Sequence, residues 1–275
     1  MAHRTIALYG ETGSGKTTLG GELAKDQFKA NRTKTLLNAA DMGGYESILS
    51  LVKLGVIDVN QYNIGDDPWI WVNAGCSTQP PDDVGLVVFD SATSISEAIL
   101  SYIAKSEGKV GAQNTQKFTV TSKDKSLVVG SNNMNHYGIV QTFMLDMIWK
   151  STWLAKSGVD VLWTFSTDKG ENANEQTVIG PKLAGHALTS AIPKWFQYTF
   201  RVASIPQLDM APSHVLYLQE QSENGMLGFG NARYPLDAQT PLPDKLEPAS
   251  LVEALRLIEQ GQVEAEQSLR EELGL

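Results

Sequence analysis

The sequence predicts an α/β fold, in which a twisted, mainly parallel sheet is flanked by helices and carries an antiparallel extension. Short apolar runs of strand length alternate with longer segments of helical periodicity. The apolar runs show little polar alternation, which is typical of strands buried on both faces of a parallel sheet. The chain has 275 residues, of which 42% are hydrophobic, so it can bury a sizeable core.

The first elements form a strand, turn, helix and strand unit. Residues 5–9 are a compact β-prone run, and a glycine-rich turn at residues 10–15 follows. Residues 16–30 have helical composition and lead to a second apolar run at residues 35–40. We expect this second strand to lie beside the first. A short helix over residues 45–54 is expected next.

The central part of the chain adds another strand and helix. A loop-rich segment contains Trp69 and Trp71, which alternate like one face of a strand and favour a core or subunit-interface position. Residues 86–89 form a continuous apolar run that predicts a buried parallel strand. The residues Ile95, Ile99, Tyr102 and Ile103 then recur at helical spacing.

Residues 108–137 are polar and predict a long flexible loop with a small hairpin around residues 118–129. A strong amphipathic helix follows and ends near Gly158, before a buried strand at residues 159–165. The indoles of Trp149, Trp153 and Trp163 are assigned to packing.

Two strands at residues 198–205 and 214–220 lack helix-length connections, so we expect both in the antiparallel extension. A short helix from about Pro248 and an acidic, frayed tail after Gly261 complete the chain. The predicted division is a main domain over residues 1–243 and a C-terminal helix with an acidic tail over residues 244–275.

Composition and charge exclude several classes of protein. Asp and Glu number 31 against 22 Lys and Arg, for a formal net charge of −9, so a nucleic-acid partner would have to bind a local basic patch. Cys76 is the only cysteine, which excludes an intrachain disulfide and fits a reducing cytosol. No apolar run has the length of a signal peptide or a membrane span, so we expect a soluble cytoplasmic protein.

The glycine-rich turn matches the phosphate-binding pattern G-x-x-x-x-G-K-[ST] at every fixed position. Its residues are Gly10, Glu11, Thr12, Gly13, Ser14, Gly15, Lys16 and Thr17, and Thr18 follows in the first helical turn. Such a turn points successive backbone N–H groups at phosphate oxygens, and the helix adds the positive end of its dipole. Lys16 would neutralise the β- and γ-phosphates of ATP, and the Thr17 hydroxyl would ligate Mg²⁺.

The second half of such a site is an acidic residue at the end of a buried strand. Asp90 follows the apolar run at 86–89 and is the predicted Mg²⁺ partner of Thr17, although a turn or helix cap is the alternative role. The next residue is Ser91 rather than a glutamate, so the water-activating base comes from elsewhere. Asp41, at the end of the second strand, is the first candidate, and Glu46 and Glu11 are substitutes.

The four histidines show no metal-ligand spacing. They are His3, His136, His186 and His214, and we interpret them as surface or loop residues.

These residues together resemble the RecA-like ATPases encoded by bacteriophages, including the small single-strand-annealing recombinases. The phosphate loop, Asp41, the Asp90-Ser91 pair and the segment at residues 180–185 leading to Arg201 carry the resemblance, which spans roughly residues 4–248. Asn231-Ala232-Arg233 resembles a family motif that places a basic residue before its last arginine, except that Asn231 replaces the basic residue.

The resemblance implies a RecA-like P-loop core and an Mg²⁺-dependent ATPase that assembles into a ring or filament on single-stranded DNA in an infected bacterial host. A phage single-strand-binding protein would be a further partner. Arg233 or Arg201 would reach a neighbouring subunit's nucleotide, and Ser166 or Thr167 would sense the γ-phosphate. By position, two loops at residues 105–137 and 167–180 would face the DNA. The first carries the predicted DNA contacts, Lys109, Lys117, Phe118, Lys123 and Lys125.

Two other classes of function share the phosphate loop. In a nucleotide or small-molecule kinase, the lysine-bearing loop would be a substrate lid. In a non-enzymatic assembly protein, bound nucleotide would only lock an oligomer. Catalytic roles are therefore assigned to Lys16, Asp41, Asp90 and Arg233 on the condition that the protein turns ATP over.

Overall fold

The fold is described from a computed structural model. It describes residues 3–41, 43–63, 66–110, 117–122, 125–130, 134–171, 177–184, 191–207, 210–223, 226–228, 230–235 and 237–274. Within these ranges, only the backbone is described for residues 104–110, 117–122, 125–130, 134–135, 170–171, 210–211, 221–223 and 226–227.

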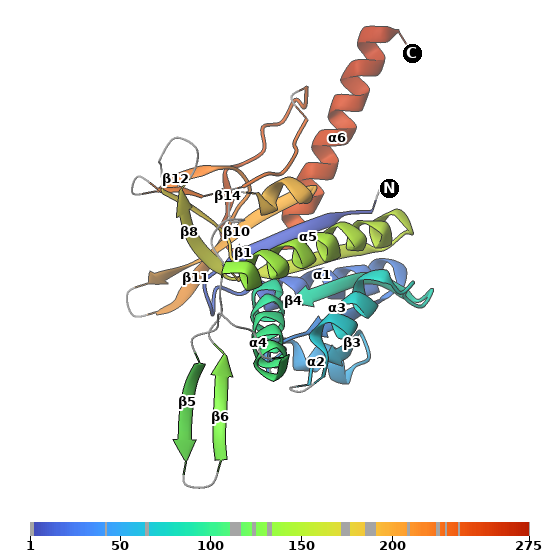
Figure 1. Cartoon of the computed structure of the whole chain (residues 1–275). Coiled ribbons are helices and arrows are strands. Elements are labelled where there is room, and N and C mark those ends of the chain that lie inside the picture. Colours follow the sequence, from blue (N-terminus) through green and yellow to red (C-terminus); the bar gives the residue numbers. More distant parts are fainter. Residues whose placement is uncertain are drawn as a thin grey trace.

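An eight-stranded sheet forms the centre of the molecule, with the strand order β14-β11-β10-β1-β7-β4-β2-β3 (Figure 1). Its strands are β1 (Thr5–Gly10), β2 (Lys34–Ala39), β3 (Ile57–Gln61), β4 (Val84–Asp90), β7 (Asp160–Phe165), β10 (Tyr198–Gln207), β11 (Met210–Tyr217) and β14 (Lys245–Leu246). All pairs from β10 across to β3 are parallel, and β11 and β14 are antiparallel additions. The predicted fold class is therefore confirmed.

Two strand predictions are wrong in detail. β10 was expected to be antiparallel, but it runs parallel to β1, with Ile6 opposite Tyr198. β2 was expected beside β1, but β7 and β4 lie between them. Both errors concern pairing between distant segments, which strand composition alone does not encode. β3 was not predicted, because its alternating sequence IDVNQ lacks a continuous apolar run.

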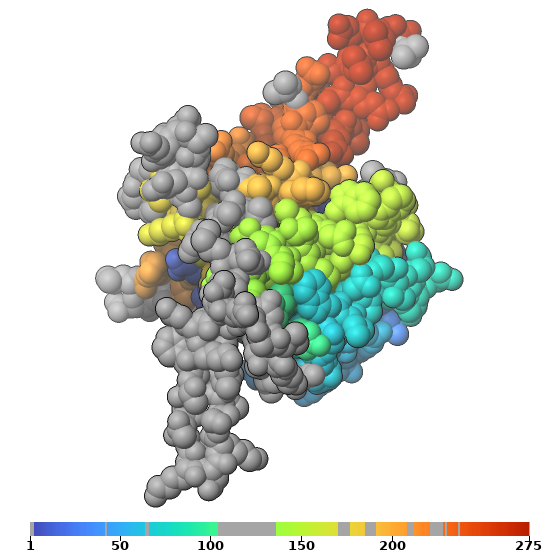
Figure 2. Space-filling model, viewed as in Figure 1, coloured from blue at the N-terminus to red at the C-terminus, as the bar shows by residue number. Residues whose placement is uncertain are grey.

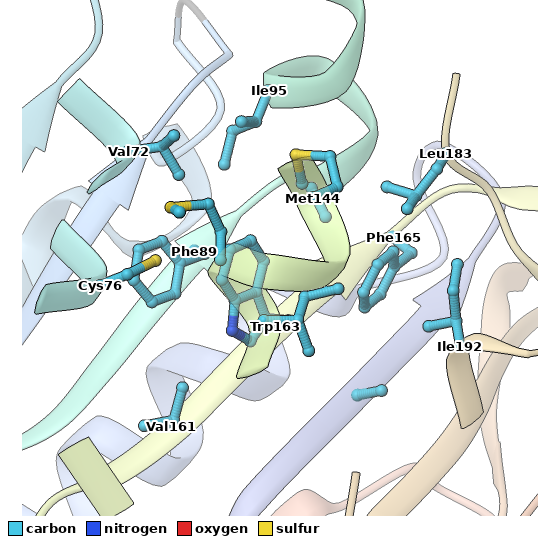
Figure 3. Close-up of a cluster of buried hydrophobic side chains, with 14 of the residues drawn as sticks. Val72, Cys76, Phe89, Ile95, Met144, Val161, Trp163, Phe165, Leu183 and Ile192 are labelled. Carbon is cyan, nitrogen blue, oxygen red and sulfur yellow. The ribbon is translucent and has the colours of Figure 1, made fainter. Parts of the chain in front are cut away.

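Helices α3 (Pro68–Ser77), α4 (Ala92–Val110) and α5 (Met134–Lys156) cover one face of the sheet. Their apolar side chains join those of β1, β4 and β7 in one buried cluster. At its centre the rings of Phe89 and Trp163 stack, 4.1 Å apart and 15° from parallel, with Met144 and Cys76 around them (Figure 3). The Trp163 indole N–H donates to the Ser151 hydroxyl at 3.0 Å, so its polar atom is also satisfied.

The other face of the sheet is covered by α1 (Lys16–Asn31), by the single turn η1 (Glu46–Ile48) with α2 (Leu49–Lys53), and by α6 (Leu251–Leu273). Ser250 caps α6 by accepting from the Glu253 N–H. Glu22 of α1 accepts from the Ser250 hydroxyl and from the Leu251 N–H, which ties the start of α6 to α1. β14 is thus a strand of the central sheet. The first half of α6 packs in the same hydrophobic core as α1.

The segment with Trp69 and Trp71 forms α3, not the strand face that their alternation indicated. Asp67 accepts from the N–H groups of Trp69 and Ile70, and Pro68 occupies the first helical turn, so a capping signal outweighs the alternation. Both indoles are partly buried and pack against the apolar cluster under α3, α4 and α5, in agreement with the predicted core position. Trp69 meets Phe143 edge-on at 4.0 Å.

The assignment of three tryptophans to packing holds only for Trp163. Trp149 and Trp153 are half-exposed on α5, with their rings edge-to-face at 6.2 Å, and Lys156 Nζ lies 4.5 Å from the centre of the Trp153 ring. A helix of this length has one buried face, and these two residues lie on the opposite one.

The C-terminal helix is longer than predicted. α6 continues through Gly261 to Leu273, and its second half extends away from the body of the molecule (Figures 1 and 2). Gly261 is tolerated because the Tyr234 ring lies directly against its Cα, where any side chain would collide. The glycine therefore marks a packing contact, not the end of the helix.

Two smaller sheets complete the chain. β8 (Thr167–Glu171) and β9 (Thr177–Pro181) pair with β12 (Gln221–Glu223) and β13 (Met226–Gly228), in the order β12-β13-β9-β8. β5 (Lys117–Ser122) and β6 (Lys125–Gly130) form the hairpin predicted around residues 118–129, with Phe118 opposite Val129. Figure 1 shows this hairpin extending away from the central sheet.

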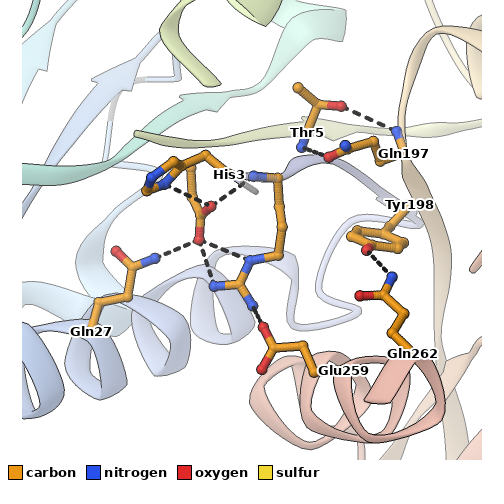
Figure 4. Close-up of polar contacts among 9 residues, drawn as sticks. His3, Thr5, Gln27, Gln197, Tyr198, Glu259 and Gln262 are labelled. Carbon is orange, nitrogen blue, oxygen red and sulfur yellow. Dashed lines mark hydrogen bonds and ion pairs between the residues drawn. The ribbon is translucent and has the colours of Figure 1, made fainter. Parts of the chain in front are cut away.

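A buried ion-pair network closes the amino edge of the sheet, where the parallel strands begin (Figure 4). Asp160, at the start of β7, accepts from the Arg4 backbone N–H at 2.8 Å, from Arg4 Nε at 3.0 Å and from Arg4 Nη2 at 2.6 Å. Gln27 of α1 donates to the same carboxylate at 2.7 Å. The other Arg4 amino group binds Glu259 of α6 at 2.9 Å, so this network joins the residue before β1 to β7, α1 and α6.

Candidate functional site

The glycine-rich motif forms a turn at the carboxyl edge of the sheet, between β1 and α1. Gly13 and Gly15 have φ values of 79° and 97°, which residues with a Cβ rarely adopt. The Ser14 N–H donates to the Glu11 carbonyl at 3.1 Å, so the chain turns back on itself before α1 begins at Lys16. The backbone therefore has the course that the sequence predicted for a phosphate-binding loop.

Lys16 lies along the inside of this turn. Its Nζ donates to the carbonyls of Gly10 at 2.8 Å and Glu11 at 2.9 Å. Burial lowers the pKa of Lys16, and the negative charges of Asp90, Asp41 and Glu11 oppose this shift. These three carboxylates therefore favour the ammonium form of Lys16.

Asp90 and Thr17 meet at the mouth of the turn. The Thr17 hydroxyl donates to Asp90 Oδ2 at 2.7 Å, and the Thr164 hydroxyl donates to Oδ1 at 2.5 Å. Asp90 is buried, and burial raises its pKa; the two hydroxyls and Lys16 oppose this rise, whereas Asp41 adds to it. A hydroxyl and a carboxylate in contact are hard oxygen donors of the kind that Mg²⁺ prefers, so these residues fit the metal that the sequence predicted.

Thr164 was missed by the sequence analysis, which named Ser166 or Thr167 as the polar residue at the end of this strand. In the structure the Thr164 side chain is fully buried and binds Asp90, whereas the Ser166 backbone N–H donates to the Thr93 hydroxyl at 3.0 Å. The available signal was a threonine inside the apolar run Val-Leu-Trp-Thr-Phe, where a hydroxyl needs a partner.

Asp41 lies beside this site for a different reason than expected. β2 does not flank β1, but it pairs with β4, and the Ala40 N–H donates to the Asp90 carbonyl at 2.7 Å. The exposed Asp41 therefore follows directly after the residue bonded to Asp90, close enough to affect the pKa values of both Asp90 and Lys16. The two substitutes, Glu11 and Glu46, are exposed in the turn and at the start of η1.

The two candidate arginines lie in different places. Arg201 is opposite Tyr9 on β10, near the carboxyl edge, and its guanidinium lies 5.1 Å from the centre of the Tyr217 ring. Arg233 lies at the amino edge, where its Nη2 approaches the Lys194 carbonyl at 3.5 Å and where it shares a groove with Thr5, the first residue of β1. Arg233 is thus on the opposite edge of the sheet from the turn that contains Lys16.

The predicted DNA contacts are not located by the structure. The side chains of Lys109, Lys117, Phe118, Lys123 and Lys125 lie outside the described residues, and only the strands β5 and β6 are described in this region. The second predicted DNA loop is the β8–β9 pair rather than an irregular loop. These DNA contacts therefore stay a prediction.

His214 is a further residue that sequence reasoning missed. It was interpreted as a surface or loop residue, but it lies on β11, and its ring is about 3.6 Å from the place where a Cβ on Gly15 would be. Its Nδ1 is buried without a hydrogen-bond partner, as is the Ser14 hydroxyl. His136 also departs from that interpretation, because it is fully buried on α5. No sequence signal brings β11 to the turn, because the contact depends on strand pairing.

The described residues contain no group of three or more His, Cys, Asp or Glu side chains able to hold a metal ion among themselves. None of the helices in the described part of the chain is long and apolar enough to cross a membrane.

No protein-family model matches the chain, and no curated protein shows a significant match. Among solved structures, the chain is similar to the flagellar accessory protein FlaH from Methanocaldococcus jannaschii, at 14% identity and a TM-score of 0.44. That similarity covers 79% of this chain and 78% of FlaH.

Proposed function

We propose that this protein binds ATP with Mg²⁺ at the turn between β1 and α1 and hydrolyses the β–γ phosphoanhydride bond. The observation that carries the proposal is the 2.7 Å contact between the Thr17 hydroxyl and the buried Asp90 carboxylate, next to Lys16 in a turn with two left-handed glycines. Each group is of the type that phosphoryl transfer requires at that place.

In this proposal the residues of the turn have separate roles in binding the nucleotide. Backbone N–H groups from Gly13 to Thr18 hold the β-phosphate, and Lys16 exchanges its contacts with the Gly10 and Glu11 carbonyls for phosphate oxygens. Thr17 and Asp90 would hold Mg²⁺, which neutralises charge on the transferring phosphoryl group when it is bound. Thr164 keeps the Asp90 carboxylate in place from the side opposite Thr17.

The attacking water needs a carboxylate that faces the γ-phosphate. We assign Asp41 to orient this water, because it is exposed and lies beside Asp90, and Glu46 and Glu11 are the alternatives. Arg233 cannot serve its own subunit's nucleotide from the amino edge, so its proposed role requires a neighbouring copy. The same neighbour would link turnover to self-association into a ring or filament.

The biological substrate in this proposal is single-stranded DNA, in recombination or annealing during phage infection, with a phage single-strand-binding protein as a further partner. The support is the sequence resemblance and the lysines around the β5–β6 hairpin. The net charge of −9 confines any such contact to a local surface.

The test measures ATP hydrolysis with and without single-stranded DNA, for the wild-type chain and for Lys16→Ala. We expect DNA to stimulate turnover, raised salt to weaken that stimulation, and Lys16→Ala to lower turnover about 100-fold or more. Lys25→Ala, which removes an exposed lysine from the same helix, is the matched control and should leave the rate unchanged.

Other outcomes would change the proposed function. ATP turnover that single-stranded DNA does not change would contradict the DNA role. The protein would then be an ATPase with another substrate or partner. Transfer of phosphate to a nucleoside or a small molecule would identify a kinase. Nucleotide binding without any turnover would indicate an assembly protein that nucleotide only locks.

A further inference from the structure

The second half of α6 carries an apolar stripe that the rest of the chain leaves open. Leu251, Leu255 and Ile258 are spaced by four and three residues and are fully buried against the sheet and α1. The same spacing continues through Gln262, Ala265, Leu269 and Leu273. Leu269 is 51% exposed and Leu273 is 61% exposed, so the stripe that holds the helix on the body continues past the body uncovered.

The contacts of α6 end partway along its length. Glu264 accepts from the Thr240 N–H at 3.0 Å and from the Thr240 hydroxyl at 3.1 Å. In the described part of the chain, no residue of α6 after Glu264 forms a hydrogen bond or ion pair with another helix or strand. Arg270 forms its ion pair with Glu266, one turn earlier in the same helix. The last turns of α6 are therefore held by bonds within the helix, and Leu269 and Leu273 stay exposed there.

A groove lined by basic and aromatic side chains lies at the amino edge of the sheet. It has a volume of about 570 Å³ and is formed by α5, the turn η3 (Ile192–Trp195) and the segment around Arg233. Lys156 and Arg233 line it together with the partly exposed Trp195 indole. The described lining also contains Ala155, Thr152 and Gln197 but no acidic side chain.

The helix end and the groove are complementary in charge. The end of α6 carries Glu264, Glu266, Glu271 and Glu272 against one arginine, Arg270. The groove presents Lys156 beside aromatic surface that can cover leucine side chains; Arg233 is not used in this contact and remains the candidate for a neighbour's nucleotide. Amphipathic helices are commonly bound by laying their apolar face into such a groove.

We propose that the end of α6, from Glu266 to Leu273, docks into the Trp195–Lys156 groove of a second copy of this chain. Leu269 and Leu273 pack on Trp195, and the two glutamates that flank this stripe, Glu266 and Glu272, pair with Lys156. The contact joins two different surfaces, so the copies either exchange helices reciprocally or extend into a larger assembly. It specifies the self-association in the proposed function, and it needs neither ATP nor DNA.

The test measures mass against protein concentration by sedimentation, without nucleotide, for the full chain. We expect the wild type to form assemblies above the 29.9 kDa of one copy. Leu269→Glu and Leu273→Glu should each raise the dissociation constant about tenfold or more, because each places a charge on the docked face. Both positions are exposed in the single chain, so folding should be unaffected.

Val263→Glu is the matched control. Val263 is on the same helix and is 53% exposed, but it lies off the stripe of Leu269 and Leu273. Its substitution should leave the mass unchanged. If Val263→Glu weakens assembly as much as Leu269→Glu does, the stripe is not the contact and the proposal is wrong.

The groove is tested by charge exchange. Lys156→Glu should weaken assembly, and the combination of Lys156→Glu with Glu266→Lys and Glu272→Lys should restore part of it. Lys53→Glu changes an exposed lysine of α2 and should have no effect. Assembly that is lost in Leu269→Glu but unchanged in both Lys156→Glu and Trp195→Ala would mean that α6 pairs with another α6, which contradicts the groove.

Two further results would overturn the proposal. One is a wild type that stays monomeric at every concentration. The other is binding of a single-stranded oligonucleotide that Trp195→Ala abolishes while the mass of the protein is unchanged, because the groove would then be a nucleic-acid site. Lys16→Ala should still assemble, so loss of ATP turnover and loss of this contact are separate results.

Discussion

Asp90 and Asp160 are both buried aspartates on neighbouring strands of one sheet, but their surroundings differ. Asp160, at the amino edge, is held by the fixed positive charge of Arg4 and by Gln27 (Figure 4). Asp90, at the carboxyl edge, is held by two neutral hydroxyls, and burial raises its pKa. The amino edge therefore neutralises its carboxylate within the fold, whereas the carboxyl edge leaves negative charge for a cation that arrives with the substrate.

The largest expected effect is at the amino edge. Asp160→Ala would leave Arg4 and Gln27 without their shared acceptor, and we expect it to lower the free energy of unfolding by about 3–5 kcal/mol. Urea unfolding followed by circular dichroism measures this loss. A double variant, Arg4→Met with Asp160→Leu, removes both charges and should recover most of the stability. A double variant no more stable than Asp160→Ala would contradict a cost due to the unpaired charge.

The corresponding change at the carboxyl edge should affect activity instead. Asp90→Asn keeps the shape of the side chain but removes the charge that would hold Mg²⁺, and one of the two hydroxyls must then accept from the new amide N–H. We expect ATP turnover to fall about 10²–10³-fold, with no loss of stability. Steady-state hydrolysis over a Mg²⁺ titration checks this, and unchanged turnover would remove Asp90 from the site.

A smaller effect is expected for Thr164, which binds Asp90 from inside the sheet. Thr164→Val removes the hydroxyl and should weaken Mg²⁺-dependent nucleotide binding about tenfold, the size expected for one hydrogen bond to a charged group. Calorimetric titration measures the affinity, and Thr164→Ser, which keeps the hydroxyl, is the control. Equal affinities for the Val and Ser variants would show that the hydroxyl has no role.

The raised pKa of Asp90 predicts a pH dependence of stability in the nucleotide-free protein. Because the folded state binds this proton more tightly than the unfolded state, its contribution to stability decreases as the pH rises through the folded pKa. Asp90→Asn should therefore be more stable than the wild type at neutral pH. This advantage should shrink as the pH falls toward about 3.9, the ordinary value for aspartate. Urea midpoints at several pH values test this, and an advantage independent of pH would exclude the titration of Asp90 as its cause.

The smallest expected effect is at the outer end of the amino-edge network. Glu259→Gln removes the partly exposed ion pair with Arg4 but leaves the bonds between Arg4 and Asp160 in place. We expect a loss of about 0.5 kcal/mol in the free energy of unfolding, which added salt reduces. A loss close to that of Asp160→Ala would mean that α6 and the strands share one cooperative network.

Local signals were sufficient for some elements and insufficient for others. The course of the turn at residues 10–15 could be predicted because two left-handed residues need glycine, and the buried strands could be predicted from their apolar runs. The helix α3 could have been predicted too, since Asp67 and Pro68 are an N-terminal capping signal, but the alternation of Trp69 and Trp71 was given more weight. For α6, Gly261 was read as the end of the helix, because its role against the Tyr234 ring is not visible in the sequence.

The sequence by itself determined the phosphate-loop chemistry, because the order of glycine, lysine and threonine encodes both the turn and the groups it presents. Its apolar runs also indicated the buried strands β1, β2, β4 and β7. Only the tertiary structure decided that β7 and β4 separate β1 from β2, that Thr164 supports Asp90, and that His214 lies behind Gly15. The physical reason is that strand pairing depends on side-chain packing across the whole sheet, between segments far apart in the chain, and no local pattern specifies it.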